Sequence, residues 1–195
     1  MIQNYAFIAA LLAAAALVGC GSSPKSNFYT LSSGTAPERA GTKAQYSVAI
    51  GPVTVPEIIG RPQIVTRSDS NEVQIAEFER WASPVNSEIS RALADDLMQQ
   101  LDGAYVYVYP QNLTFYADYQ VLLEVQRFDA KLGDAVSVEA LWAVRPAQGG
   151  AVKSGRSIVR EATKGNSYSA LVAAYSAALT AVSHDIAEAI RSTRQ

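Results

Sequence analysis

The chain has little of the chemistry on which many enzymes and metal proteins depend. Its 195 residues include one cysteine and one histidine. A single cysteine excludes an internal disulfide, and these two residues are too few for a cluster of His and Cys metal ligands. Any chemistry must therefore use carboxylates, hydroxyls or amines, and we predict neither a metal nor a cofactor.

Charge is also scarce. Lys and Arg number 16 against 18 Asp and Glu, which gives a formal net charge of -2, and no long block of either sign occurs. Because surfaces that bind nucleic acid are basic, this balance argues against a nucleic acid partner. Apolar residues make up 49% of the chain, which is enough for one globular domain with a sizeable core.

Sequence motifs of catalysis are missing as well. The chain has no glycine-rich phosphate loop, no GxSxG elbow and no HxE pair. Asp95 and Asp96 are neighbours in a predicted helix and point about 100° apart, which is too divergent for a paired acid and base. His184 lies beside Asp185 on the polar flank of another predicted helix, where a solvated histidine is the ordinary case. We therefore predict no catalytic residue.

What the chain does have is a long apolar run near its start. Residues 6–19 are continuously apolar, a run shorter than the roughly 20 residues of a membrane-spanning helix and typical of a signal-peptide core. The run ends in LVGC, residues 17–20, which resembles the bacterial lipobox, whose cysteine becomes lipidated. We predict a signal peptide over residues 1–19 and acyl chains of the palmitate type on Cys20. Gly21 stands where an aspartate commonly retains such proteins at the inner membrane, so the periplasmic face of the outer membrane is favoured.

A tether is predicted to follow the lipidated residue. Residues 20–45 are rich in Ser, Gly, Thr, Ala and Pro. As a coil of about 25 residues it would have a root-mean-square span of roughly 25–30 Å, holding a single domain, residues 46–195, off the membrane. The apolar segment FYTL, residues 28–31, interrupts this composition. It is either a docking segment or an edge strand, and we favour the strand.

The rest of the chain alternates between strand and helix patterns. Alternating apolar residues indicate strands, and apolar residues at three- and four-residue spacing indicate helices. Strands are expected at 46–56, 60–67, 71–82, 104–110, 119–129, 135–145 and 151–161, and helices at 84–101 and 166–192. We predict an α+β fold, with a mixed, largely antiparallel sheet and two main helices packed on one face.

Two local signals refine this pattern. Gly51-Pro52 interrupts the first long strand, which predicts a bulge or an edge position there. Ser83 and Pro84 introduce the first helix, with Ser83 as its N-cap and Pro84 at the first helical position.

The segment GPVTVPEIIGRPQIVTR, residues 51–67, carries the most specific pattern in the chain. It is followed by WASP at 81–84, a helix at 89–101 and a Trp-bearing strand that ends in LWAV at 141–144. Together these segments resemble the auxiliary lipoproteins of ABC-type transport systems over nearly all of the chain after the signal peptide. The most specific block of the resemblance is formed by Pro56, Arg61, Pro62, Gln63, Ile64, Val65 and Arg67.

The resemblance implies a non-enzymatic periplasmic component, anchored in the outer membrane, that docks with a partner of the mammalian-cell-entry (MCE) type. Such systems are linked to the movement of phospholipid or other hydrophobic molecules between membranes and to envelope integrity. The resemblance also suggests a homo-oligomer. We predict that the partner-binding residues are Pro56, Arg61, Pro62, Gln63, Arg67 and Trp81.

Two alternatives stay open. From the residues alone, Arg61 and Arg67 also fit the ordinary case of a strand end with a local salt bridge. A periplasmic lipid-modifying or hydrolytic enzyme is the alternative function, and it requires a concave pocket in which at least two polar side chains converge.

Overall fold

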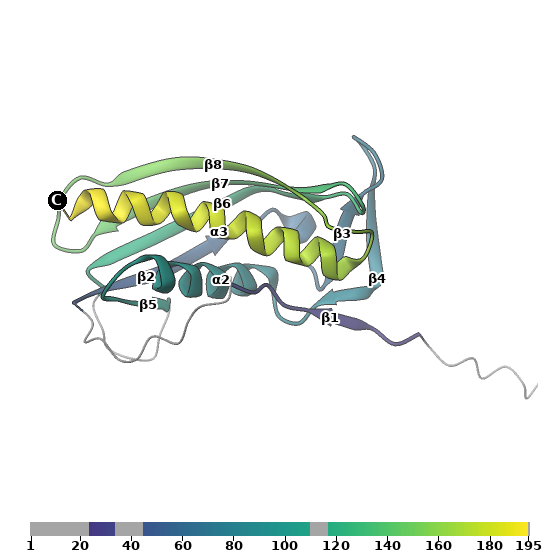
Figure 1. Ribbon diagram of the computed structural model, residues 1–195, viewed down its shortest axis with the longest axis horizontal. Coiled ribbons are helices and arrows are strands. Elements are labelled where there is room, and N and C mark those ends of the chain that lie inside the picture. Colours follow the sequence, from purple (N-terminus) through teal and green to yellow (C-terminus); the bar gives the residue numbers. More distant parts are fainter. Residues whose placement is uncertain (1–23, 34–44, 110–116, 195) are drawn as a thin grey trace, which may run out of the picture.

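The computed structural model describes residues 24–33, 45–109 and 117–194. The predicted signal peptide and Cys20 lie outside the described residues, as does most of the predicted tether. The described strands are β1 (Asn27–Tyr29), β2 (Tyr46–Thr54), β3 (Gln63–Arg67), β4 (Val73–Trp81), β5 (Ala104–Val108), β6 (Tyr119–Ala130), β7 (Ala135–Pro146) and β8 (Lys153–Ala162) (Figure 1). The helices are the 3-10 helix η1 (Glu57–Ile59) and the α-helices α2 (Val85–Gln100) and α3 (Tyr168–Thr193).

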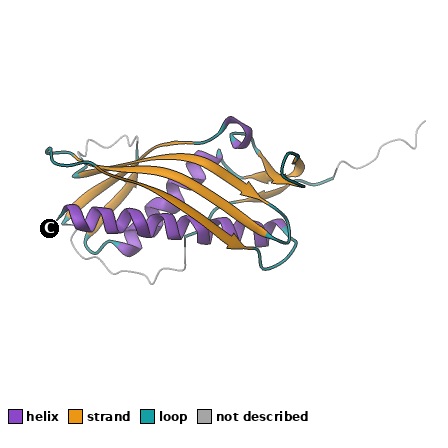
Figure 2. Cartoon of the chain, turned by 90° about the horizontal axis from the view of Figure 1, so that it is seen from above, coloured by secondary structure: helices purple, strands orange, loops and turns teal. Residues whose placement is uncertain are grey.

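The larger sheet has five strands in the order β5-β2-β6-β7-β8. Its long ladders, β6 with β7 and β7 with β8, are antiparallel, whereas β2 runs parallel to both β5 and β6. Both α-helices lie on one face, α2 against β2 and β5 and α3 against β7 and β8. Figure 2 shows α3 running along the length of the sheet. The predicted α+β class, with a mixed sheet and helices on one face, is confirmed.

The core lies between this sheet and the two helices. The inward side chains of β6 and β7 alternate with outward ones, and Val121, Leu123, Val136 and Val138 are at most 2% exposed. Helix α3 is long and apolar enough, by length and composition, to cross a membrane, but 61% of its most apolar window is buried inside the protein. It is therefore the central core helix of the fold.

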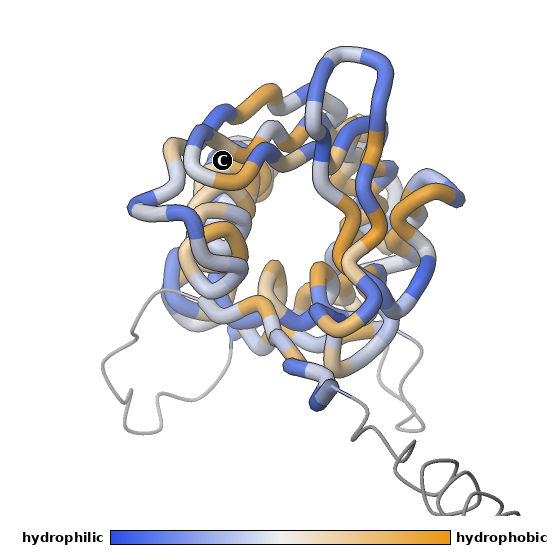
Figure 3. The backbone as a smooth tube through the Cα atoms, turned by 90° about the vertical axis from the view of Figure 1, so that its right-hand side faces the viewer, coloured by the Kyte–Doolittle hydropathy of each residue, from blue (hydrophilic) through white to orange (hydrophobic). Residues whose placement is uncertain are grey.

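A second, smaller sheet has three strands in the order β1-β4-β3. Strand β1 pairs in parallel with β4 at the sheet edge, which confirms the edge strand predicted at FYTL. Strands β3 and β4 form the predicted hairpin, and the Asp69 carboxylate closes its turn by accepting the N–H groups of Asn71 and Glu72 at 2.8 and 3.0 Å. In Figure 3 this hydrophilic turn stands at the top of the molecule.

The first helix begins one residue later than predicted. Pro84, rather than Ser83, is the N-cap of α2, and Val85 is the first helical residue. The reason is that Pro84 keeps an extended ψ of 132°, so its carbonyl accepts the Glu88 N–H at 3.1 Å while its own backbone stays outside the helix.

The predicted interruption at Gly51-Pro52 is a bulge. The register of β2 against β6 shifts between Ile50 and Val53. Gly51 adopts a φ of +122°, a conformation that glycine reaches without strain. The strand is not at an edge, because β5 and β6 flank it on both sides.

Candidate docking surface

The chain leaves β2 through a compact turn formed by η1. The N–H of Ile59 donates to the carbonyl of Pro56, and that of Gly60 to the carbonyl of Glu57, both at 3.1 Å. Ile59 is buried and holds the turn on the core, whereas its neighbour Ile58 is 44% exposed. The turn therefore presents a large aliphatic side chain to solvent on a fixed base.

The predicted residues that follow this turn stay accessible. The Nε of Arg61 donates to the carbonyl of Ile58 at 3.1 Å, so the guanidinium folds back over η1. Pro62 is exposed, and its carbonyl accepts the Trp81 N–H at 2.7 Å. Gln63 is half-buried, and its amide lies 3.5 Å from the Glu77 carboxylate. Together with the half-buried Pro56, these residues form a continuous stretch, which we call the docking turn (residues 56–63).

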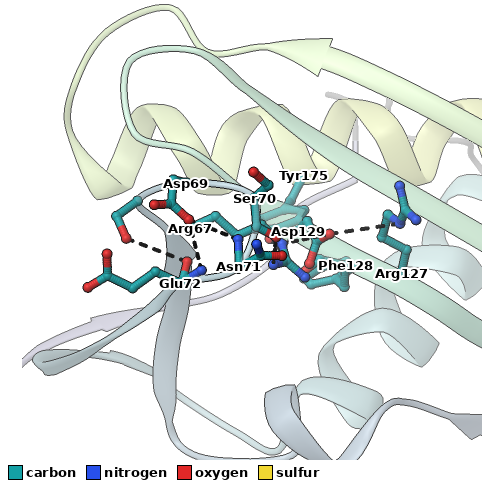
Figure 4. A network of polar contacts seen from close by, with 10 residues as sticks. Arg67, Asp69, Ser70, Asn71, Glu72, Arg127, Phe128, Asp129 and Tyr175 are labelled. Atoms are coloured by element: carbon teal, nitrogen blue, oxygen red, sulfur yellow. Dashed lines mark hydrogen bonds and ion pairs between the residues drawn. The ribbon is translucent and has the colours of Figure 1, made fainter.

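Arg67, in contrast, is engaged within the protein. Its Nε lies 2.9 Å from the Asp129 carboxylate on β6, and its Nη1 donates to the carbonyl of Ser70 at 3.4 Å (Figure 4). Arg127 approaches the same carboxylate oxygen at 3.8 Å. The ion pair at this position is therefore not a local one, because it links the smaller sheet to the larger sheet.

Trp81 lies in the core rather than on the surface. It is 5% exposed, and its ring centroid lies 6.3 Å from Phe128 and 6.2 Å from Tyr175. The rings of Phe128 and Tyr175 stack at 3.8 Å, and the Tyr175 hydroxyl donates to the Phe128 carbonyl at 3.0 Å. Burial raises the pKa of Tyr175 well above its ordinary value; the Asp129 charge raises it further, and Arg67 opposes this effect. This aromatic cluster joins the two sheets beneath the Arg67–Asp129 pair.

The structure fixes the segment around β1 to the domain. The hydroxyl of Tyr29 donates to the Glu79 carboxylate, and burial together with Glu79 raises the pKa of Tyr29 to about 12. The N–H of Ser32 donates to the Ser176 hydroxyl of α3 at 3.2 Å. The strand that interrupts the predicted tether is therefore held to β4 through Tyr29, and the chain directly after it is held to α3 through Ser32.

A buried carboxylate on α2 completes this attachment. Glu88 is 2% exposed, accepts the Leu31 N–H at 3.1 Å and pairs with the Arg91 guanidinium. Our sequence reasoning missed this residue, although a signal was present. Glu88 lies three residues after Val85 and four before Ala92, on the apolar stripe of the helix, where a carboxylate needs a partner.

The smaller sheet also exposes two phenylalanines that the sequence reasoning did not single out. Phe28 is 66% exposed and Phe78 is 44% exposed. Phe28 pairs with Arg80 in the β1–β4 ladder, whereas the adjacent pair, Tyr29 with Trp81, meets the core. Phe28 and its register partner Arg80 therefore share the outer face of this ladder, and the exposed Phe78 lies two residues before Arg80, where the register of β4 against β3 shifts.

A hollow of about 490 Å³ lies at the end of the molecule that carries the C-terminus. Tyr46, Asp118, Lys153 and Arg194 are among its lining residues. The Arg194 guanidinium lies 3.8 Å from the centre of the Tyr46 ring, and the Asp118 carboxylate accepts the N–H and hydroxyl of Ser47 at 2.7 and 2.8 Å. The hollow has the concavity that an enzyme requires, but several of its polar groups are held by their own chain. Within the described ranges, no three His, Cys, Asp or Glu residues are grouped to hold a metal ion.

Comparison with known proteins identifies the family. The family model of the ABC-type transport auxiliary lipoprotein component matches residues 29–187, and the chain belongs to this family. It is thus a membrane-associated lipoprotein of a family that serves transporters as an auxiliary component. No curated protein is significantly similar in sequence.

Two solved structures share the fold. One, described as an uncharacterized protein, has a TM-score of 0.70 and 18% identity, over 86% of this chain and 99% of its own. The other, a Xanthomonas campestris protein of family DUF330, has a TM-score of 0.64 and 20% identity, over 83% of this chain and 93% of its own. At these identities the likeness concerns the fold alone.

Proposed function

We propose that this protein is the non-catalytic docking subunit of an MCE-type system that transports lipid between membranes and supports envelope integrity. In this proposal acyl chains on Cys20 anchor it to the periplasmic face of the outer membrane. Membership of a transport auxiliary family supports a transporter as its partner. The structural observation that carries the docking role is the accessible docking turn, with Ile58 and Arg61 on its surface.

The docking turn has the properties of a preformed binding surface. Its base is fixed by the buried Ile59 and by the hydrogen bond from the Trp81 N–H to the Pro62 carbonyl. A surface that is already ordered loses little conformational freedom when a partner binds. The turn also carries an arginine, a residue that is enriched at energetically important interface positions.

The six predicted partner-binding residues take different roles in this proposal. Pro56, Arg61, Pro62 and Gln63 would contact the partner directly. Arg67 and Trp81 would act indirectly, because the first pairs with Asp129 and the second is buried under the sheet junction. Their substitution would affect docking mainly by loosening the base of the turn.

Co-purification from detergent tests the docking turn. We expect Arg61→Ala and Ile58→Ser to reduce recovery of the MCE-domain partner, while Arg156→Ala, which removes an exposed arginine from β8 of the other sheet, leaves it unchanged. Unchanged recovery with both turn variants would reject this surface. Turnover of a phospholipid or ester by the purified protein would instead support the enzyme alternative.

Fatty-acid labelling tests the anchor separately. The wild-type chain should incorporate labelled fatty acid when it is exported, and Cys20→Ala should not. A bare thiol on the exported wild-type chain, found by mass spectrometry, would reject the anchor and leave the docking test unaffected.

A further inference from the structure

The outer face of the β1–β4 ladder carries Phe28 beside Arg80, and a second exposed aromatic residue, Phe78, lies two residues before Arg80 on β4. Phe28 and Phe78 expose 66% and 44% of their surfaces beside Arg80. Two carboxylates flank Phe78 along β4. Glu79 accepts hydrogen bonds from Asn27 and Tyr29, whereas Glu77 is exposed and lies 3.5 Å from the Gln63 amide, and its carbonyl accepts the Arg80 Nε at 2.9 Å. Exposed apolar residues grouped on one face mark an interaction site, and an aromatic group flanked by cations suits the boundary between lipid headgroups and acyl chains.

The position of this face in the chain places it near the lipid anchor. Phe28 follows Cys20 by eight residues, so a fully extended chain between them spans at most about 29 Å. The exposed Lys25 lies within this connection. Of the exposed large apolar side chains that the structure describes, Phe28 is the first after Cys20.

The strand that carries Phe28 is also fixed to the domain. Tyr29 is held by Glu79, Leu31 by Glu88 and Ser32 by Ser176. The short connection therefore keeps this end of the domain near the anchor, because β1 does not move independently of the domain. Figure 1 shows β1 at the opposite end of the long axis from the C-terminus, so an anchor attached here brings this end toward the membrane.

We propose that the outer face of the β1–β4 ladder is a membrane seat, in which Phe28 and Phe78 insert into the bilayer interface and Arg80 meets lipid phosphates. This inference rests on the proposed lipid anchor at Cys20. Gln63 lies opposite Arg80 on the next strand, so the docking turn adjoins the seat. A partner bound to the docking turn would thus stand at the membrane surface, where a lipid enters or leaves the bilayer.

Tryptophan fluorescence tests the seat, and each variant is compared with the wild-type chain, whose Trp81 and Trp142 supply the background emission. The Phe28→Trp and Phe78→Trp variants of the full chain are placed on vesicles of equal parts phosphatidylethanolamine and phosphatidylglycerol, with or without bromine on the acyl chains. We expect brominated lipid to quench both new tryptophans. Val152→Trp is the matched control, because Val152 is 52% exposed and lies in the β7–β8 turn beside the C-terminus, and its emission should not change.

The reactivity of Cys20 allows the membrane seat to be tested independently of the proposed lipid anchor. Cys20 carries the only thiol in the chain, so the mature chain can be coupled through it to a maleimide lipid if fatty-acid labelling shows that the cell does not lipidate it. Quenching at positions 28 and 78 on such vesicles would support the seat even if the proposed biological anchor fails. Quenching no stronger than at position 152 would overturn the seat while labelling still supports the anchor.

A second measurement uses a weak anchor. When Cys20 is coupled to a single acyl chain, vesicle binding is marginal, so loss of two inserted rings in Phe28→Ser/Phe78→Ser should weaken vesicle binding on the order of tenfold. Both side chains are exposed, so the variant should fold, which circular dichroism checks. Equal binding would overturn the proposal. A second result would also overturn the proposal: tryptophans at positions 28 and 78 that are shielded from solvent without vesicles, in a self-associated form of the protein. The face would then join copies of the chain.

Discussion

The two sheets of this protein use apolar residues in opposite ways. In the five-stranded sheet, two helices cover one face, and the apolar side chains beneath them are almost completely buried. The three-stranded sheet meets the core through Trp81 and Tyr29 but leaves Phe28 and Phe78 in solvent. The buried apolar residues of the first sheet therefore stabilise the fold, although Ile158 on its edge strand β8 is 68% exposed, whereas the exposed pair of the second sheet is available for binding.

The largest expected effect is a difference in the free energy of unfolding between two phenylalanine variants. Phe128 is 3% exposed and stacks on Tyr175, so Phe128→Ala should lower the free energy of unfolding by about 3–5 kcal/mol through lost packing and a cavity. Phe78→Ala, on the exposed face, should change it by no more than about 0.5 kcal/mol. Urea denaturation measures both changes. Equal losses of free energy of unfolding in the two variants would show that the two sheets do not differ in this way.

The next effect concerns the attachment of β1. Glu88→Ala leaves the Leu31 N–H without its acceptor and should destabilise the protein by about 1–3 kcal/mol. Hydrogen exchange of the Leu31 amide should become faster. Asp95→Ala, at an exposed position of the same helix, is the control and should leave both measurements nearly unchanged. If the Leu31 amide stays protected in Glu88→Ala, the carboxylate does not hold β1.

A smaller effect is expected at the junction of the two sheets. The side chains of Arg67 and Asp129 are 37% and 30% exposed, so their ion pair is partly screened by solvent. Arg67→Ala should lower the free energy of unfolding by about 0.5–1 kcal/mol at low salt and by less at high salt. Arg61→Ala, which loses only a local hydrogen bond to Ile58, should have almost no effect. If Arg61→Ala lowered the free energy of unfolding more than Arg67→Ala, Arg61 would have the structural role that is assigned here to Arg67.

The smallest effect is a pH dependence carried by Tyr29. The hydroxyl has an ordinary pKa of 10.0 and one of about 12 in the folded protein. Between these values the folded state retains a proton that the unfolded state has lost, so the free energy of unfolding falls as pH rises. The contribution is fully present below pH 10 and is lost as pH rises through about 12.

Tyr29→Phe should make this slope shallower in denaturation series at alkaline pH. Some slope should remain, because burial also raises the pKa values of Tyr107, Tyr168 and Tyr175. An unchanged slope would show that burial and Glu79 do not raise the pKa of Tyr29 in the folded protein.

Sequence patterns predicted the elements of the fold well because those patterns are local. Alternation in β6 and the four-residue spacing in α2 and α3 each reflect a single element facing one core. The two-sheet arrangement was not predicted. It depends on β1 pairing with β4 about fifty residues later, with Asn27 opposite Glu79, and no local pattern encodes that contact.

The candidate site was predicted in part for the same reason. The residues of the proposed docking turn were predicted together because they lie within one short segment that matches a family pattern. Arg67 and Trp81 belong to the same stretch of chain, yet their surroundings come from Phe128, Asp129 and Tyr175. The pattern predicted all six as partner-binding residues, and it did not show that Arg67 pairs with Asp129 or that Trp81 is buried.

The sequence by itself determined the family, the predicted anchor at Cys20 and the order of strands and helices, because each depends on a pattern of residues close together in the chain. Only the tertiary structure decided which apolar side chains are buried. Phe28, Phe78 and Phe128 are chemically identical, and they differ because helices cover one sheet face and nothing in the described chain covers the outer face of β1 and β4. Burial depends on which elements pack together, and that is settled by contacts between residues far apart in the chain.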